Sequence, residues 1–126
     1  MTVRQIAPDS WTAELDGFTR RHEGWLVSIK LRAADGSTAV GAHDLPLLGV
    51  SRGSRDPNHI AIAVGDADDH LIHDVHDATV LGVELTADLA ERALVIESED
   101  GSTTSVEFRS PVRVEEVDGL PAPHRS

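Results

Sequence analysis

The chain has no cysteine, a single lysine, and only four aromatic residues in 126 positions: Trp11, Phe18, Trp25 and Phe108. Without cysteine, disulfides, thiolate catalysis and sulfur ligands for metals are all excluded. So few aromatic side chains do not provide the stacking platforms of proteins that bind single-stranded nucleic acid, and they are too few for a sugar-binding cleft. Thiol chemistry and recognition by stacking are therefore poor interpretations of this sequence.

Segments that direct a chain to a membrane are also missing. Pro8 and Asp9 interrupt the N-terminus before the apolar run of a signal peptide can develop, and no later stretch approaches the length that spans a bilayer. The charge is one-sided, because 22 acidic and 11 basic residues give a formal net charge of −11, which repels a phosphate backbone. We expect a cytoplasmic protein that binds neither nucleic acid nor a membrane.

The length is that of one ordinary domain, and it allows a core that needs neither disulfides nor a structural metal. The hydrophobic pattern weakens after Pro111, and the last seven residues contain two prolines. We therefore predict a single domain over residues 1–119 and a frayed C-terminal tail over residues 120–126.

One helix is clearly indicated, over Ser10–His22. Four large side chains recur at spacings of four, three and four residues, which places them on one face of a helix. Asp9 or Ser10 can cap its start, and Gly24 can end it. We expect this face to pack on the protein's own sheet; it consists of Trp11, Leu15, Phe18 and His22.

After Gly24 the pattern alternates, which is typical of half-buried strands. Asp35-Gly36 and Asp100-Gly101 are hairpin signals. Only residues 86–92 are ambiguous, because they favour a helix but are too few for more than one or two turns. Besides the strand that begins at Trp25, the candidate strands are Thr38–Ala42, Leu47–Ser51, His59–Val64, His70–Val75, Thr79–Leu85, Arg92–Ser98 and Thr103–Arg109.

No second long helix is available to connect parallel strands, so the sheet should be mainly antiparallel. The predicted fold class is α+β, with one N-terminal helix packed on a strongly bent, barrel-like or sandwich-like sheet of seven or eight strands. Neither Thr79–Leu85 nor Arg92–Ser98 contains a proline, so we expect these strands to offer open edges for a homodimer or another protein. The predicted core is Trp11, Leu15, Phe18, Trp25, Val27, Ile29, Ile60, Ile62, Val64, Leu81, Val83, Leu94, Ile96, Val106 and Phe108.

Potential metal ligands are densest in residues 66–77, which hold five aspartates and three histidines and no lysine or arginine. On a strand, His70, Asp74 and His76 share one face while His73 points to the other. Residues four apart on a strand are about 13 Å apart, so only Asp74 and His76 are close enough to share an ion. His59 or His43 from another strand would be needed to complete a site. The calcium pattern fails, because Leu71 stands where an EF-hand needs glycine.

Other catalytic patterns are weaker. His43 and Asp44 are neighbours, but neighbouring residues on a strand point to opposite faces, so we expect that they do not orient one another. Ser51, Ser54 and Ser105 lie in no nucleophile elbow. The Gly- and Arg-containing turn at residues 49–55 matches neither a P-loop nor a dinucleotide fingerprint.

Several segments together resemble a bacterial family of short proteins known only as a domain of unknown function. They are Asp9-Ser10-Trp11, the residues from Arg21 to Val27, the residues from Asp44 to Val50, the residues from Val106 to Pro111, and the residues from Val117 to Leu120. The resemblance spans nearly the whole chain and implies a stand-alone domain. It carries no catalytic residues, and the triplet of His70, His73 and His76 is not part of it.

The sequence therefore predicts a non-enzymatic interaction or accessory domain, with no catalytic residue, no cofactor, and a homodimer or an unidentified protein as partner. The alternative is a divalent-metal-binding protein or small metal-dependent enzyme that uses the Asp/His-rich segment 66–77, with His70, Asp74 and His76 as ligands.

Overall fold

The computed structural model of the chain describes residues 2–66 and 68–113. The predicted tail, residues 120–126, lies outside the described residues. One helix and eight strands make up the fold, and they are α1 (Trp11–His22), preceded by the short 3-10 turn η1 (Pro8–Ser10), and β1 (Thr2–Ile6), β2 (Leu26–Arg32), β3 (Thr38–Arg52), β4 (Ile60–Gly65), β5 (His70–Val75), β6 (Ala78–Leu85), β7 (Ala90–Ser98) and β8 (Thr103–Arg113). No described helix has both the length and the apolar character needed to cross a membrane.

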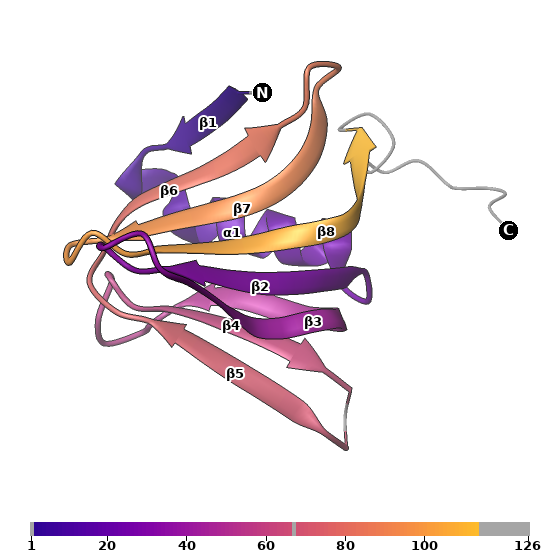
Figure 1. Cartoon of the computed structure of the whole chain (residues 1–126), viewed down its shortest axis with the longest axis horizontal. Helices are drawn as coiled ribbons and strands as arrows, with labels where there is room; N and C mark the ends of the chain where they lie inside the picture. The colour runs from indigo at the N-terminus through magenta and orange to yellow at the C-terminus, as the bar shows by residue number, and fades with distance from the viewer. Residues whose placement is uncertain (1, 67, 114–126) are drawn as a thin grey trace, which may run out of the picture.

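All strands belong to one antiparallel sheet in the order β1-β6-β7-β8-β2-β3-β4-β5 (Figure 1), which confirms the predicted α+β class. The strands at the two ends of this order, β1 and β5, are open edges, and so are residues 38–43 at the start of β3, which pair with β2 alone. The prediction that Thr79–Leu85 or Arg92–Ser98 is an edge was wrong, because both strands are paired on each side. The N-terminal strand, which the alternation pattern had not indicated, covers the edge of β6.

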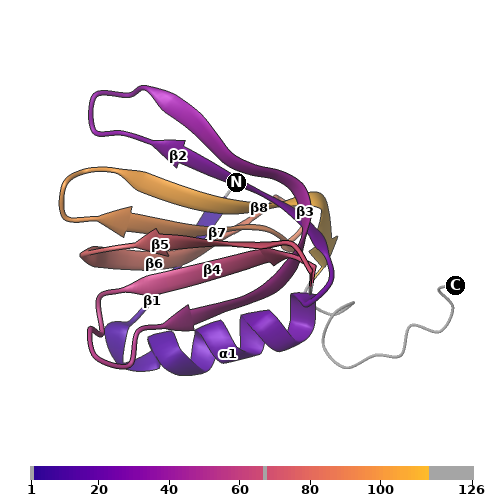
Figure 2. The same ribbon diagram turned by 90° about the horizontal axis from the view of Figure 1, so that it is seen from below.

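The sheet bends at Asp44, in the middle of β3. Two predicted strands, Thr38–Ala42 and Leu47–Ser51, are one 15-residue strand, and Asp44 adopts a positive φ of 50° where they join. The first half of β3 pairs with β2 and the second half with β4. We call β1, β6, β7, β8, β2 and the first half of β3 the long arm, and the second half of β3 with β4 and β5 the short arm. In Figure 2, β3 runs from the hairpin with β2 down to α1.

Helix α1 lies along the free edge of the second half of β3. The Thr19 hydroxyl donates to the Val50 carbonyl at 3.1 Å and accepts from the Val50 N–H at 2.9 Å. One side chain thus satisfies the backbone groups that a neighbouring strand would otherwise pair. The helix ends as predicted, with Gly24 at a positive φ of 87°. The Ser10 side chain, however, makes no capping hydrogen bond.

The core lies between the two arms and the helix. Fourteen of the fifteen predicted core residues are buried; Trp25 is partly exposed and packs against the cluster. Further buried apolar residues lie on strands whose pattern was incomplete in the sequence, among them Ile6, Leu47, Val50 and Val75. The inner face of the sheet is thus dry, whereas its outer face is open to solvent.

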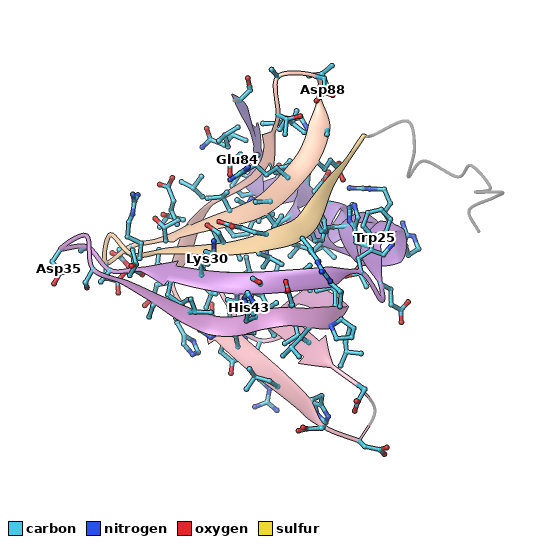
Figure 3. All side chains as sticks on the ribbon, turned by 45° about the vertical axis from the view of Figure 1, so that its right-hand side comes forward. Trp25, Lys30, Asp35, His43, Glu84 and Asp88 are labelled. Carbon is cyan, nitrogen blue, oxygen red and sulfur yellow. The ribbon has the colours of Figure 1, made fainter. Side chains whose placement is uncertain are left out.

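Both Asp-Gly signals are hairpin turns. In each, an aspartate carboxylate accepts hydrogen bonds from the N–H and the hydroxyl of the serine two residues later, Asp35 from Ser37 and Asp100 from Ser102. These bonds hold the pKa of Asp35 and Asp100 below the ordinary value. Figure 3 shows Asp35 at the tip of its hairpin. The ambiguous residues 86–92 form a short turn that enters β7, not a helix.

Candidate functional site

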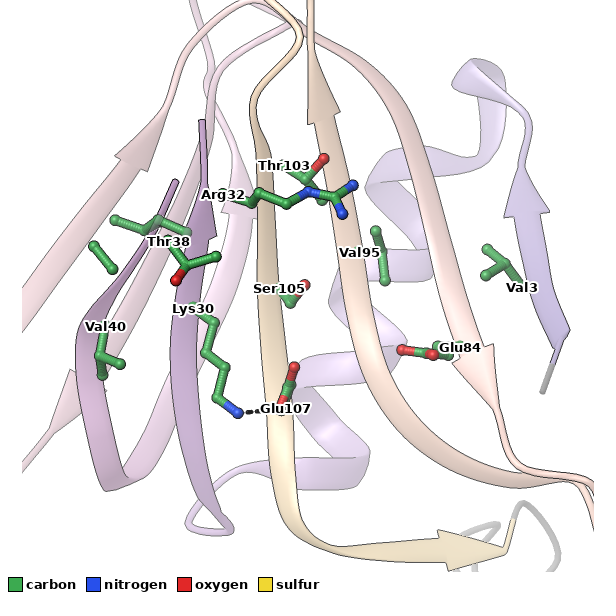
Figure 4. A pocket seen from close by; sticks show the side chains of 12 residues that line it. Val3, Lys30, Arg32, Thr38, Val40, Glu84, Val95, Thr103, Ser105 and Glu107 are labelled. Carbon is green, nitrogen blue, oxygen red and sulfur yellow. Dashed lines mark ion pairs between the residues drawn. The ribbon is translucent and has the colours of Figure 1, made fainter. Parts of the chain in front are cut away.

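A groove of about 680 Å³ runs across the outer face of the long arm (Figure 4). Cross-strand register explains its lining, since Lys30 lies opposite Ser105 and Val40, while Val3 lies opposite Glu84. Valine side chains form its apolar parts, and Lys30 and Glu107 form an ion pair of 3.0 Å across it. The groove therefore combines apolar, hydroxyl and charged groups on one sheet face.

The groove is shallow and open. None of the residues that line it is buried, and the Lys30 side chain is 54% exposed. Arg32 reaches across it beside Thr103, with no carboxylate of the described chain within ion-pair distance. Small-molecule pockets usually enclose most of their ligand, so this surface is suited to a flat contact rather than to a substrate.

The described residues of segment 66–77 belong to the β4–β5 hairpin and the edge strand β5. As predicted, His70–Val75 is a strand. His59 precedes β4 and lies across from His76, and the two rings stack with centroids 4.9 Å apart. The His59 Nε2 atom is 2.8 Å from Asp74 Oδ1. His59, not His70, is therefore the histidine that contacts Asp74.

This cluster does not amount to a metal site among the residues that the structure describes, where no group of three or more ligand side chains is arranged to hold an ion. His43 contacts Asp44 instead of the cluster. His73 points to the inner side, toward a cleft of about 370 Å³ between β5 and the hairpins of the long arm. The Asp74 carboxylate with one imidazole resembles a surface pair, which would bind a divalent ion weakly.

Ser28, His43 and Asp44 meet at the bend of β3. The Ser28 hydroxyl is 3.5 Å from His43 Nδ1, and His43 Nε2 is 3.6 Å from Asp44 Oδ2. The expectation that His43 and Asp44 point apart was wrong, because the positive φ of Asp44 interrupts the alternation of the strand. Nucleophile and base are normally about 2.6–3.2 Å apart. Both distances are longer, and the Ser28 oxygen already accepts the Asp44 N–H at 3.1 Å, so we assign no catalysis to these residues.

The only histidine and the only glutamate that the described residues bury completely lie together. His22 is 0% and Glu91 2% exposed, and His22 Nε2 is 3.1 Å from Glu91 Oε1. His22 Nδ1 is 3.0 Å from the Phe18 carbonyl, which only accepts, so Nδ1 carries a proton. The Nε2 atom faces the Glu91 carboxyl at ion-pair distance, although neither Nε2 nor Glu91 Oε1 makes a hydrogen bond of normal geometry. Three aromatic rings surround the imidazole, at centroid distances of 4.4–5.1 Å: Phe18, Trp25 and Phe108.

A β-bulge turns Glu91 inward. In β7, Ala93 pairs with Glu84 and Glu91 with Leu85, so Arg92 has no partner in β6. Burial raises the pKa of Glu91, but the contact with His22 and the positive charges of Arg21, His22 and Arg4 outweigh it and hold that pKa below the ordinary value. Neither His22 nor Glu91 lines any of the four hollows of about 340–680 Å³ on the described surface, and the pair joins α1 to β7 in the interior.

The outermost strand of the short arm exposes consecutive apolar side chains. Leu71 is 44% and Ile72 52% exposed, although both belong to β5. Ile72 also borders an outer hollow of about 440 Å³ that includes Ala61 and Ala63 of β4 and residues of α1. In Figure 1, β5 forms the free lower border of the sheet. Among the large exposed apolar residues of the described chain, Leu71 and Ile72 are the only two that are consecutive.

Sequence reasoning found the strand β5, but it missed two features. Glu91 stood in the ambiguous segment 86–92, and no pattern signals a bulge. The true edges depend on strand order, which short-range patterns do not encode. The aromatic spacing of α1, by contrast, already placed His22 on the buried face.

No curated protein and no solved structure shows significant similarity to this chain. Residues 2–117 match a family of unknown function, DUF5335. The match covers the helix, all eight strands and the segments on which the resemblance was based, except residues 118–120. The chain therefore belongs to the DUF5335 family.

Proposed function

We propose that the chain is a non-enzymatic interaction domain that associates through the open edge of its sheet, first of all with a second copy of itself. The observation that most directly supports this proposal is the exposure of Leu71 and Ile72 on the edge strand β5. An edge strand presents unpaired backbone N–H and C=O groups, and another strand can pair with them. Adjacent exposed apolar side chains add hydrophobic contact to those hydrogen bonds.

Edge strands of monomeric proteins usually carry lysine, proline or a bulge that prevents pairing. β5 has none of these, and its register with β4 is continuous from Ile60 to Gly65. The edge strand at the other end of the sheet, β1, differs because its Arg4 forms an ion pair of 3.4 Å with Glu14 of α1. The open edge at the start of β3 differs because Val40 is its one large exposed apolar residue, without an exposed apolar neighbour such as Leu71 and Ile72 have in one another. We therefore assign the association to β5.

The net charge of −11 opposes association of two copies. A contact limited to one short strand belongs to the small end of protein interfaces, so we expect dissociation constants on the order of micromolar. Because salt screens repulsion between like-charged proteins, the dimer should tighten when ionic strength rises from about 0.05 M to about 0.5 M.

Sedimentation velocity across about 5 to about 500 µM protein tests the proposal, because that range brackets a micromolar equilibrium. We expect a concentration-dependent shift from monomer to dimer. Ile72→Lys should abolish it by placing a charge on the edge. Val40→Lys is the matched control, since Val40 is similarly exposed, at 60%, on the other arm. A monomer throughout, or equal loss in both variants, would refute the proposed edge.

Divalent-metal binding is a second candidate, favoured by the meeting of His59, Asp74 and His76. It modifies the predicted set of His70, Asp74 and His76 by placing an imidazole from beyond β5 beside the carboxylate. Such a surface site would leave most coordination positions to water and would bind zinc weakly. His76 belongs to both histidine sets, so the zinc experiment in the Discussion, which removes His70 and His76 together, tests both sets at once.

A further inference from the structure

We propose that the two copies pair in one register, with Ile72 opposite Ile72 of the second copy and each His70 opposite Asp74 of the other. This inference rests on the proposed function and adds to it the alignment and the groups that recognise one another. The backbone of β5 restricts which residues can bond outward, and the side chains restrict which of those alignments is favourable.

The hairpin between β4 and β5 shows which backbone groups are free. The Asp66 N–H donates to the Asp69 carbonyl at 3.1 Å, and Gly65 is the partner of His70. Gly65 and His70 therefore form a pair without mutual hydrogen bonds. Because bonded and non-bonded pairs alternate along an antiparallel ladder, the N–H and C=O groups of His70, Ile72 and Asp74 point away from β4, toward the open edge.

Only alignments that keep each face of the sheet continuous are acceptable, so outer-face residues must oppose outer-face residues. Centring the pair on Ile72 uses all three outward-pointing residues and places His70 opposite Asp74 twice. Centring it on Leu71 places Asp74 opposite Asp68 of the second copy, so that two negative charges face each other. Centring it on His73 places Ile72 opposite Asp74, an apolar side chain against a carboxylate. The first alignment is favoured by both charge and burial.

The side chains that would meet in this alignment are accessible to a second copy. His70, Ile72 and Asp74 are exposed. Asp74 uses Oδ1 for His59, at 2.8 Å, and its second carboxylate oxygen can accept from His70 of the second copy. Ile72 lies beside Ala63 of β4, its register partner, so two isoleucines can meet without a bulky neighbour. The interface would thus have an apolar centre between two imidazole–carboxylate pairs.

Cross-linking tests the register directly, because the native chain has no cysteine. Directly opposed residues that exchange hydrogen bonds have Cα atoms about 5.5 Å apart, within the disulfide range of about 4.4–6.8 Å. Ile72→Cys should therefore give a disulfide-linked dimer on mild oxidation. Leu71→Cys should not, because two copies of that residue would be diagonal neighbours about 7–8 Å apart. Preferential cross-linking of Leu71→Cys or His73→Cys would indicate one of the other two registers and overturn the inference.

A charge variant tests the recognition pair. His70→Asp places two carboxylates opposite one another at each end of the interface, and we expect it to weaken the dimer about tenfold. His43→Asp is the control, since His43 is 78% exposed on the first half of β3 and gives the same change in charge (Figure 3). Equal weakening by both variants would overturn the pairing of His70 with Asp74. A dimer that forms without cross-linking at Ile72 would refute the register alone, whereas a wild-type monomer would refute the proposed function.

Discussion

Replacing Glu91 with leucine should destabilise the protein much more than replacing Glu91 and His22 together. The single change leaves the His22 imidazole buried at 0% exposure without the carboxylate that now lies 3.1 Å away. Removing one partner of a buried pair costs about 3–5 kcal/mol, because a charge or a polar atom remains without compensation. Replacing both partners by apolar side chains of similar volume is often close to neutral.

The contacts of Arg21 narrow the expected loss of stability in the single variants. Arg21 retains its 3.6 Å contact with Glu14 after Glu91 is lost, so only part of the network is broken. We therefore expect about 3 kcal/mol for Glu91→Leu and a similar cost for His22→Leu, with at most about 2 kcal/mol for the double variant. The coupling energy from the cycle should then be about 4 kcal/mol, far outside the error of additivity.

Urea denaturation of the four proteins at pH 7 measures this cycle, provided that the m-values agree. Glu97→Leu is a control on the same strand, because Glu97 is exposed and should cost less than about 0.5 kcal/mol. If the two single changes simply add in the double variant, the pair is not coupled and our account of the buried contact between His22 and Glu91 is wrong.

Three further predictions concern pH, the helix contact and metal. The pKa of Glu91 is lower in the folded protein than its unfolded value of about 4.3, so the contribution of Glu91 to the free energy of unfolding is complete above that pH and is lost as pH falls through the folded pKa. Denaturation from pH 7 to 3 should therefore show the difference in stability between wild type and Glu91→Gln closing below about pH 4. Thr19→Val should cost about 1–3 kcal/mol in urea denaturation, because both backbone groups of Val50 lose their partner. In thermal melts, added zinc should raise Tm equally in wild type and in the double variant His70→Ala with His76→Ala; stabilisation confined to wild type would support a metal site on those residues.

Local patterns were sufficient for much of the fold. The spacing of Trp11, Leu15 and Phe18 determines the buried face of α1, and glycine at a positive φ ends the helix and forms the hairpin turns. The register of β3 was not predictable, because Asp44 adopts a conformation that its residue type only tolerates. Strand order was inaccessible for a similar reason, since β1 and β6 carry no local sign of one another.

The contacts of Asp74 and Glu91 were harder to predict, because they depend on where the strands depart from the regular alternation of inward and outward side chains. Asp74 was correctly placed on a strand face, yet its actual partner, His59, lies beyond the hairpin. Glu91 is buried only because a bulge at Arg92 reverses its direction. A glutamate in an ambiguous segment has no sequence feature that distinguishes burial from exposure.

The long separation between paired segments affects synthesis on the ribosome. Thr2 pairs with Leu85, and the Phe18 ring stacks on Phe108 at 5.6 Å. The first strand and the helix therefore emerge from the ribosome well before the residues that cover them, and contacts so distant along the chain form slowly. Until β8 has been translated, the Phe18 ring lacks the Phe108 ring that stacks on it. The nascent chain should therefore depend on chaperones, which shield exposed apolar segments, until its last strands appear.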